Sequence, residues 1–297
     1  IPVAIKVLTA VGTSDPVFRS CFQNEVYAAS TLNHSVIVQV YDQGTVTDLV
    51  EMETDGSLIA GSPYLAMELA TGGTLRQVRG RLEWPQIWRI LLRLLEGLAH
   101  AHARGVIHRD IKPSNVLLSQ RTGGLKLTDF GLAAAQNEDS ASSRQVLGTP
   151  DYMAPEQIQG HHRDLGPWTD LYAMGCLATA LSTGKPPFHG RSIQETMEAH
   201  LSEPPKDFDH VCEVPNGFDD WLRQMLEKSY YLRFGRAADA AWALRQLINE
   251  DNPNLRVEFT AEQLQPDGPG AISSKPGLPF LSRHETANFT QTNVLEA

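Results

Sequence analysis

The sequence contains few cysteines, no long apolar run and no excess of basic residues. Its three cysteines, Cys21, Cys176 and Cys212, are odd in number and far apart, which excludes a disulfide framework or metal-binding pattern and indicates a reducing compartment. The richest apolar stretch, residues 87–98, is interrupted by three charged side chains and cannot span a membrane. A net charge of −10 argues against general nucleic-acid binding.

The sequence also lacks an initiating methionine, a signal peptide, internal repeats and any Gly-x-Gly-x-x-Gly segment. Its 297 residues are enough for one large domain or two small ones with a sizeable core. Ile1 stands at the start of a strand-like run, so the chain is expected to be a fragment, and the protein is expected to be cytoplasmic.

The chemically richest stretch is residues 108–115, which follow a long amphipathic helix that begins at Trp84. Asp110 can orient a hydroxyl group and accept its proton, and Lys112 can offset phosphate charge. Asn115 offers an amide that can bind a metal, and Asp129, fourteen residues later, offers a carboxylate for Mg²⁺.

Three short motifs then follow in order: Asp129-Phe130-Gly131, Gly148-Thr149-Pro150 and Ala154-Pro155-Glu156. Each motif alone is weak evidence, but the set in this order and spacing is specific. The chain resembles the eukaryotic-type serine/threonine protein kinase family. Its segment Asp110–Asn115 is most similar to the bacterial members of that family.

The resemblance covers residues 2–249 and implies an α+β, two-lobed protein-kinase-like fold. Residues 1–250 are expected to form the kinase domain, with a partial N-lobe over 1–70 and a C-lobe over 71–250. Residues 251–297 are expected to be a linker or disordered tail. The N-lobe is expected to be truncated before the third strand, without the Gly-rich loop that covers nucleotide phosphates, so the chain as it stands is expected to bind ATP weakly.

The resemblance implies catalytic roles for Asp110, Lys112 and Asn115. Asp110 orients the acceptor hydroxyl and takes its proton, while Lys112 stabilises the γ-phosphate charge. Asn115 and Asp129 are implied to hold two Mg²⁺ ions. Lys6, on the strand that resembles the family's third, is implied to bind the α and β phosphates of ATP.

The remaining nucleotide contacts are also carried over from the family. Glu25, on a helix expected over residues 18–32, is implied to pair with Lys6. Met67 is implied to line the back of the adenine pocket. The backbone C=O of Glu68 and the backbone N–H of Ala70 are implied to face the adenine edge.

Further family contacts are expected in the C-lobe. Asp170 is implied to accept bonds from the catalytic-loop backbone, and Arg233 to pair with Glu156. His162-Arg163-Asp164 repeats the letters of the catalytic motif without its lysine and asparagine, and is interpreted as a coincidence. Ser143, with Ser142 and Ser140 as alternatives, is a candidate phosphorylation site of the activation segment.

The periodicity predicts the following elements. Strands are expected over 2–8, 36–40, 45–51, 64–69, 116–118 and 125–127, and further helices over 168–181, 218–228 and 237–248.

The implied function is a serine/threonine protein kinase that uses ATP and Mg²⁺ and acts on protein substrates. The alternative is a pseudokinase-like binding scaffold. Such scaffolds usually lose one of the groups that this chain keeps, which are Lys6, Asp110, Asn115 and Asp129. A small-molecule kinase of related fold is a further alternative, but residues 148–156 resemble a peptide-docking segment.

Overall fold

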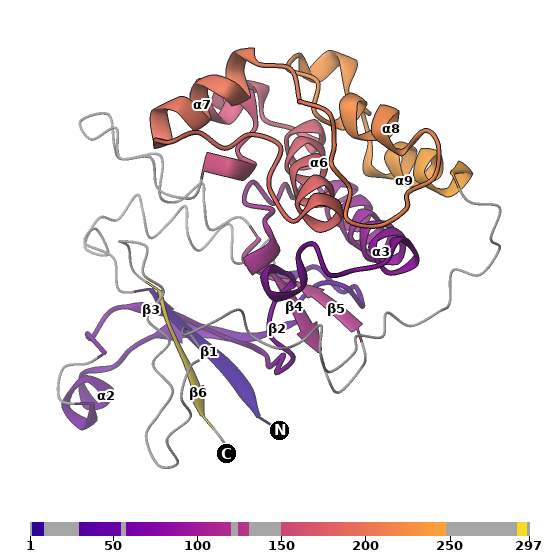
Figure 1. The fold of residues 1–297 in the computed structure, drawn as a ribbon. Helices are drawn as coiled ribbons and strands as arrows, with labels where there is room; N and C mark the ends of the chain where they lie inside the picture. Colours follow the sequence, from indigo (N-terminus) through magenta and orange to yellow (C-terminus); the bar gives the residue numbers. More distant parts are fainter. Residues whose placement is uncertain are drawn as a thin grey trace.

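The computed structural model describes residues 2–8, 30–54, 58–119, 124–130, 150–247 and 290–295. A strand-rich small lobe and a helical large lobe meet at a two-stranded hairpin (Figure 1). The small lobe contains a sheet of strand order β2-β3-β1-β6, in which every neighbouring pair is antiparallel. Its strands are β1 (Val3–Leu8), β2 (Val40–Thr45), β3 (Pro63–Glu68) and β6 (Thr290–Leu295).

Strand β6 lies beside β1, where Val3 is paired with Leu295 and Leu8 with Thr290 (Figure 1). It belongs to residues 251–297, for which the sequence predicts a linker or disordered tail. No other residue of that stretch is described, so the domain boundary near residue 250 stays a prediction.

The large lobe is built around two long helices, α3 (Trp84–His102) and α6 (Pro167–Thr183). The apolar face expected on α3 is confirmed, because Ile87, Ile90, Leu91, Leu94, Leu95 and Leu98 are all fully buried. Helix α6 is buried along nearly its whole length and is the centre of this lobe. The other helices are α5 (Pro155–Ile158), α7 (Ile193–Ser202), α8 (Phe218–Met225) and α9 (Ala237–Gln246).

The hairpin expected after residue 115 is confirmed as β4 (Val116–Ser119) and β5 (Gly124–Leu127). Its strands contribute Val116, Leu118, Leu125 and Leu127 to the main core. The hairpin thereby fixes the positions of Asn115, just before its first strand, and Thr128, just after its second strand.

Two predicted strands are wrong. Of the strand expected over residues 36–40, only an isolated β-bridge at Ile37 is found before β2 begins at Val40. The strand expected over residues 45–51 is replaced by the end of β2 and helix α2 (Asp48–Glu53). Thr47 is the N-cap and accepts a hydrogen bond from the Val50 N–H, and the acidic Asp48 and Glu51 favour the positive end of the helix dipole. None of the α2 residues is buried, so its apolar residues do not mark a core face.

Short helices connect these elements. They are η1 (Leu75–Val78), η2 (Pro113–Asn115), η3 (Pro150–Tyr152), η4 (His162–Asp164) and η5 (Tyr230–Leu232). Among the described residues, the structure contains no helix of the length and apolarity needed to cross a bilayer.

Candidate active site

Asp170 fixes the start of the loop of residues 108–115 through hydrogen bonds to its backbone. This helix α6 carboxylate is 1% exposed and accepts hydrogen bonds from the backbone N–H groups of His108 (2.9 Å) and Arg109 (2.8 Å). The Nε2 of His102 lies 2.7 Å from the same carboxylate. Arg109 has a left-handed backbone conformation, φ 67°, which costs energy in a non-glycine residue and persists where surrounding contacts impose it. The expected contact between Asp170 and the catalytic loop is confirmed.

His108 joins this loop to the end of the hairpin. Its Nδ1 accepts the Asp110 N–H at 3.2 Å, so the proton of the neutral ring is on Nε2, which donates to the Thr128 carbonyl at 2.8 Å. The ring is fully buried and packs against Phe130, with centroids 4.5 Å apart. His108 therefore packs inside the loop and links it to the end of the hairpin.

Asp110 is paired with two neighbours in the loop. Its Oδ2 lies 2.8 Å from Lys112 Nζ and accepts a 2.8 Å hydrogen bond from Asn115 Nδ2. Asn115 Nδ2 also donates to the Asp110 backbone carbonyl at 2.8 Å. The loop thus brings together all three residues predicted to be catalytic.

Asp129 faces the small lobe and pairs with Lys6 across the two lobes, with Nζ and Oδ1 2.6 Å apart. Burial disfavours the charged carboxylate, but the Lys6 ammonium outweighs it through charge and a hydrogen bond, so the pKa of Asp129 is lowered. Lys6 is 8% exposed on β1 and Asp129 has φ 69°. The partner expected for Lys6, Glu25, lies outside the described residues.

The oxygens near Asn115 and Asp129 suit a hard divalent cation. Because Asn115 Nδ2 is turned toward Asp110, its amide oxygen is the atom left for a ligand. Asn115 is 6% exposed, and its backbone carbonyl accepts the Thr128 N–H at 3.0 Å, which links it to the residue before Asp129. A carboxylate and an amide oxygen are ligands that Mg²⁺ accepts, so this donor set fits the ion. Asn115 and Asp129 as metal ligands remain a prediction.

The residues expected to contact adenine lie at the end of β3. Met67 is 7% exposed and belongs to the small-lobe core. The side chain of Glu68 is paired with Lys126 of β5, at 2.7 Å between Oε2 and Nζ. The backbone C=O of Glu68 and the backbone N–H of Ala70 as contacts of the adenine edge remain a prediction.

The ion pair of Lys126 with Glu68 is a contact at the end of β3 that the sequence prediction missed. Lys126 lies between the buried residues Leu125 and Leu127 in a strand where alternate side chains point to opposite faces. A lysine between two core leucines was the available signal, but its partner Glu68 is far away in the sequence and no local pattern identifies it.

The segment after Ala70 is tied to strand β4. Gly72 donates its N–H to the Leu118 carbonyl at 2.7 Å, and Leu118 donates its N–H to the Gly73 carbonyl at 2.9 Å. Gly73 has φ 83°, and a Cβ there would collide with the Gln77 side chain, whose Oε1 accepts the Thr74 N–H. The turn therefore requires glycine at residue 73.

We expect Gly73→Ala to destabilise the protein by about 1–3 kcal/mol, because alanine is strained in the left-handed backbone conformation and its methyl group displaces the Gln77 amide from the Thr74 N–H. Urea unfolding measures this directly. Gly235→Ala is the matched control, since no atom lies within 4 Å of the added methyl group and its φ is not in the left-handed range. Equal stability of the two variants would contradict the assigned role of Gly73.

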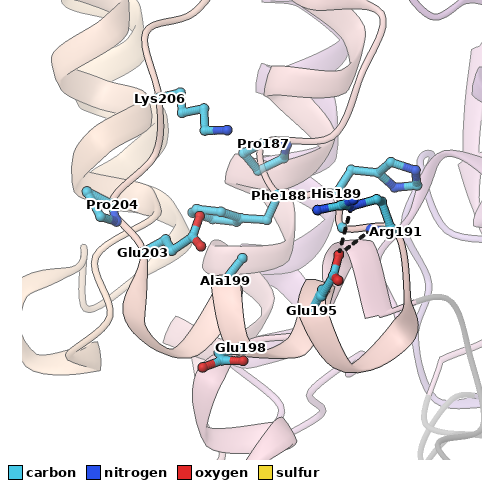
Figure 2. A pocket seen from close by; sticks show the side chains of 11 residues that line it. Pro187, Phe188, His189, Arg191, Glu195, Glu198, Ala199, Glu203, Pro204 and Lys206 are labelled. Carbon is cyan, nitrogen blue, oxygen red and sulfur yellow. Dashed lines mark hydrogen bonds and ion pairs between the residues drawn. The ribbon is translucent and has the colours of Figure 1, made fainter.

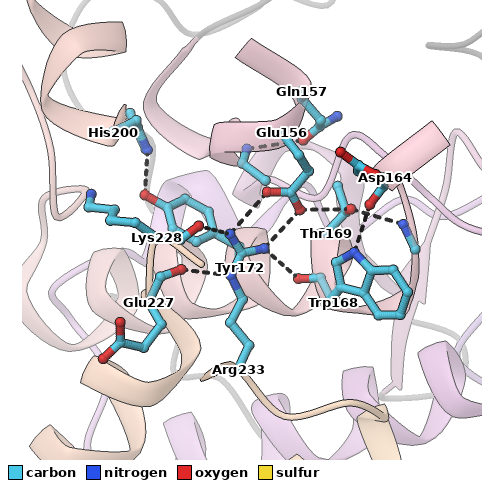
Figure 3. Close-up of polar contacts among 12 residues, drawn as sticks. Glu156, Gln157, Asp164, Trp168, Thr169, Tyr172, His200, Glu227, Lys228 and Arg233 are labelled. Carbon is cyan, nitrogen blue, oxygen red and sulfur yellow. Dashed lines mark hydrogen bonds and ion pairs between the residues drawn. The ribbon is translucent and has the colours of Figure 1, made fainter. Parts of the chain in front are cut away.

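An ion pair predicted in the large lobe is confirmed. Arg233 NH1 and NH2 lie 2.8 and 3.0 Å from the two carboxylate oxygens of Glu156, and both side chains are buried (Figure 3). Thr169 Oγ1 donates to Glu156 at 2.9 Å. Helix α5 is thereby joined to α6 and to the segment after η5.

Several expectations fall on residues outside the described part of the chain. They concern the motif residues Gly148 and Thr149 and the phosphorylation of Ser140, Ser142 and Ser143. The look-alike motif His162–Asp164 is described as the short helix η4, without a buried residue, and it contributes nothing to the loop around Asp110.

A separate hollow of about 350 Å³ lies between the loop at residues 187–191, helix α7 and residues 203–206 (Figure 2). Arg191 and Glu195 form a hydrogen bond at one end of it, and its lining carries charges of both signs. None of the predicted site residues lines it, so the hollow is distinct from the site around Asp110.

The two lobes, the loop held by Asp170 and the Lys6–Asp129 pair define a protein-kinase-like α+β fold. The chain belongs to the protein kinase domain family, which matches residues 1–246.

Similar proteins include bacterial kinases. The chain is 35% identical over 299 residues to the probable serine/threonine-protein kinase PknB of Bifidobacterium longum, covering 94% of this chain and 42% of the relative. It is 36% identical over 252 residues to the serine/threonine-protein kinase PknA of Mycobacterium tuberculosis, covering 82% and 55%. The chain thus spans about half or less of the length of these relatives.

A solved structure with a similar fold is the PknI kinase domain of Mycobacterium tuberculosis. It has a TM-score of 0.61 and 28% sequence identity, and the match covers 83% of this chain and 86% of that one. A point mutant of the same domain gives a TM-score of 0.57 and 26% identity, with 82% of this chain and 84% of that one covered.

Proposed function

We propose that this chain is the catalytic domain of a serine/threonine protein kinase, which transfers the γ-phosphoryl group of ATP to a protein hydroxyl. The observation that carries the proposal is the environment of Asp110. Its carboxylate contacts Lys112 and Asn115, and the loop that bears it is held by the buried Asp170. Relatives with serine/threonine-protein kinase names support the acceptor class.

In the proposed reaction the acceptor oxygen forms a bond to the γ-phosphorus while the bond from that phosphorus to the β–γ bridging oxygen breaks. ADP leaves with the electrons of the broken bond. Asp110 orients the hydroxyl and accepts its proton, which then passes to solvent. Lys112, next to Asp110, offsets charge on the transferred group. These residues contribute chiefly by positioning and electrostatic stabilisation.

Nucleotide binding is assigned to the region around Lys6 and Asp129, which pair across the two lobes. Lys6 is proposed to contact the α and β phosphates, with Met67, Glu68 and Ala70 around the adenine. Mg²⁺, held by Asn115 and Asp129, would neutralise phosphate charge. The lowered pKa of Asp129 keeps its carboxylate ionised, as a metal ligand must be.

We also propose that the domain works in the cytoplasm on protein substrates. Cys176 and Cys212 are free thiols, and burial raises the pKa of both, most strongly that of the fully buried Cys176. Free thiols of low reactivity fit a reducing compartment.

The test is a phosphate-transfer assay on the full natural protein with labelled ATP, Mg²⁺ and a generic protein acceptor. We expect label on serine or threonine of the acceptor, and loss of transfer when EDTA removes the metal. ATP binding without any transfer would instead support the pseudokinase-like scaffold. Transfer to small hydroxyl compounds but not to protein would support a small-molecule kinase.

A further inference from the structure

Gln157, which follows the buried Glu156 on helix α5, reaches the catalytic loop. Its Nε2 donates a 2.8 Å hydrogen bond to the backbone carbonyl of Arg109, the residue immediately before Asp110. Its Oε1 accepts the Ala154 N–H at 3.1 Å, so both polar ends of the amide are used. Glu156 points toward Arg233 and Thr169, whereas Gln157 points away from them (Figure 3).

The peptide unit between Arg109 and Asp110 is therefore held at both of its polar atoms. Gln157 binds its carbonyl oxygen, and His108 Nδ1 accepts its N–H at 3.2 Å. The preceding N–H of Arg109 is bound by Asp170 at 2.8 Å. Since Arg109 has φ 67°, an unfavourable conformation for a residue with a Cβ, these contacts oppose rotation of the peptide away from it.

The other end of this connection is rigid as well. Helix α5 is fixed by the buried Glu156–Arg233 pair and by Thr169 of α6. Because helix α5 is fixed, its hydrogen bond to the peptide before Asp110 restrains the position of that peptide relative to the helix. Loss of that bond would let the Asp110 carboxylate move relative to the acceptor hydroxyl.

We propose that Gln157 is a positioning residue. It fixes the Arg109–Asp110 peptide and thereby couples helix α5 to the Asp110 carboxylate, the group proposed to accept the proton. This inference rests on the proposed kinase function for its kinetic effect, but its structural part does not. Gln157 acts through the backbone of the catalytic loop and has no assigned contact with substrate.

Three variants of the full natural protein test the proposal. Gln157→Met keeps the length of the side chain and removes both hydrogen bonds. Gln157→Glu keeps the acceptor but places a carboxylate oxygen against the Arg109 carbonyl. Gln159→Met is the matched control, because Gln159 is exposed at the end of the same helix.

We expect kcat to fall about 10- to 100-fold in both Gln157 variants, the effect typical of a small misplacement of reacting groups, with the KM for ATP unchanged. Gln159→Met should match the natural protein. A merely structural loss would lower the amount of folded enzyme and so the apparent kcat at unchanged KM. Urea unfolding reports the folded fraction, and kcat calculated per folded enzyme should still fall in the Gln157 variants and not in Gln159→Met.

A pH series adds a readout specific to the hydrogen bond. A glutamate side chain titrates with a pKa of about 4.3 in water, and the opposing carbonyl raises it. Once protonated, it donates to the Arg109 carbonyl again. The ratio of kcat for Gln157→Glu to that of the natural protein should therefore rise as the pH falls toward about 5. The ratio of kcat for Gln157→Met to that of the natural protein should not change with pH. The other titratable groups near the loop, Asp110, Lys112 and the Glu156–Arg233 pair, are present in all variants and cancel in the ratio.

Hydrogen exchange of residues 108–111 provides the outcome that does not depend on activity. Faster exchange in Gln157→Met than in the natural protein and in Gln159→Met supports the positioning role. If that result is found without any phosphate transfer, only the proposed function fails. Unchanged exchange, full kcat in Gln157→Met, or a pH-independent ratio for Gln157→Glu overturns the inference.

Discussion

Replacement of Asp110 by asparagine should lower phosphate transfer by about 10²- to 10⁴-fold, the range expected when a positioned general base is removed. The asparagine keeps the size of the side chain and its contact with Asn115, but it cannot accept the proton of the acceptor hydroxyl. It also removes the negative partner of Lys112, which lies 2.8 Å from the carboxylate.

Two measurements separate this effect from a loss of nucleotide binding. Steady-state transfer to a protein acceptor reports the chemical step, and the thermal shift produced by ATP with Mg²⁺ reports binding. The thermal shift should be retained, because the residues assigned to the nucleotide, Lys6 and Asp129, are untouched.

A matched control lies in the same chain. Asp164 ends the sequence His162-Arg163-Asp164, which has the same three letters as the catalytic motif but forms the exposed helix η4. Asp164→Asn should leave transfer unchanged. Near-normal transfer by Asp110→Asn would refute the role assigned to Asp110.

The local parts of this site could be predicted from the sequence. Asp110, Lys112 and Asn115 lie within six residues, so a motif alone brings them together, and the structure confirms their contacts. Helices α3 and α6 were predictable because their apolar residues recur at helical spacing and a large core covers them.

Contacts across long sequence distances could be predicted only where the family resemblance implied them, as for Asp170 with the catalytic loop and Arg233 with Glu156. Others could not be predicted. The hydrogen bond from Gln157 to Arg109 ends on a backbone carbonyl, and a carbonyl carries no side-chain signature. The Lys6–Asp129 pair joins two lobes through an arrangement that only the folded chain defines. At residues 45–51 the apolar pattern indicated a strand, but the N-cap Thr47 and the first-turn acids favour a helix, and no core contact opposes them.

The buried pair between Glu156 and Arg233 gives the second large expected effect. Arg233→Met should destabilise the large lobe by about 3–5 kcal/mol, because it leaves the Glu156 carboxylate buried without its cation. Thr169 Oγ1 still donates one hydrogen bond to Glu156, which is too little to replace a guanidinium. Urea unfolding measures the free energy, and the midpoint temperature should fall with it.

The reverse change should cost less. In Glu156→Gln, Arg233 keeps hydrogen bonds to the backbone carbonyls of Glu227 (2.7 Å), Trp168 (3.1 Å) and Lys228 (3.0 Å). Its guanidinium also stays over the Tyr172 ring, with the carbon 4.7 Å from the ring centroid. A buried cation with these partners is better compensated than a buried carboxylate with one hydroxyl donor.

The double variant Glu156→Gln with Arg233→Met completes the comparison. It should recover part of the stability lost in Arg233→Met, because no unpaired charge remains buried. Arg236→Met is the control, since Arg236 pairs with Asp239 at the surface and solvent screens that pair, so the unfolding free energy should not change detectably. If Arg233→Met were no less stable than Arg236→Met, Glu156 would have to be solvated in solution, and helix α5 could not be the fixed support on which the positioning role of Gln157 depends.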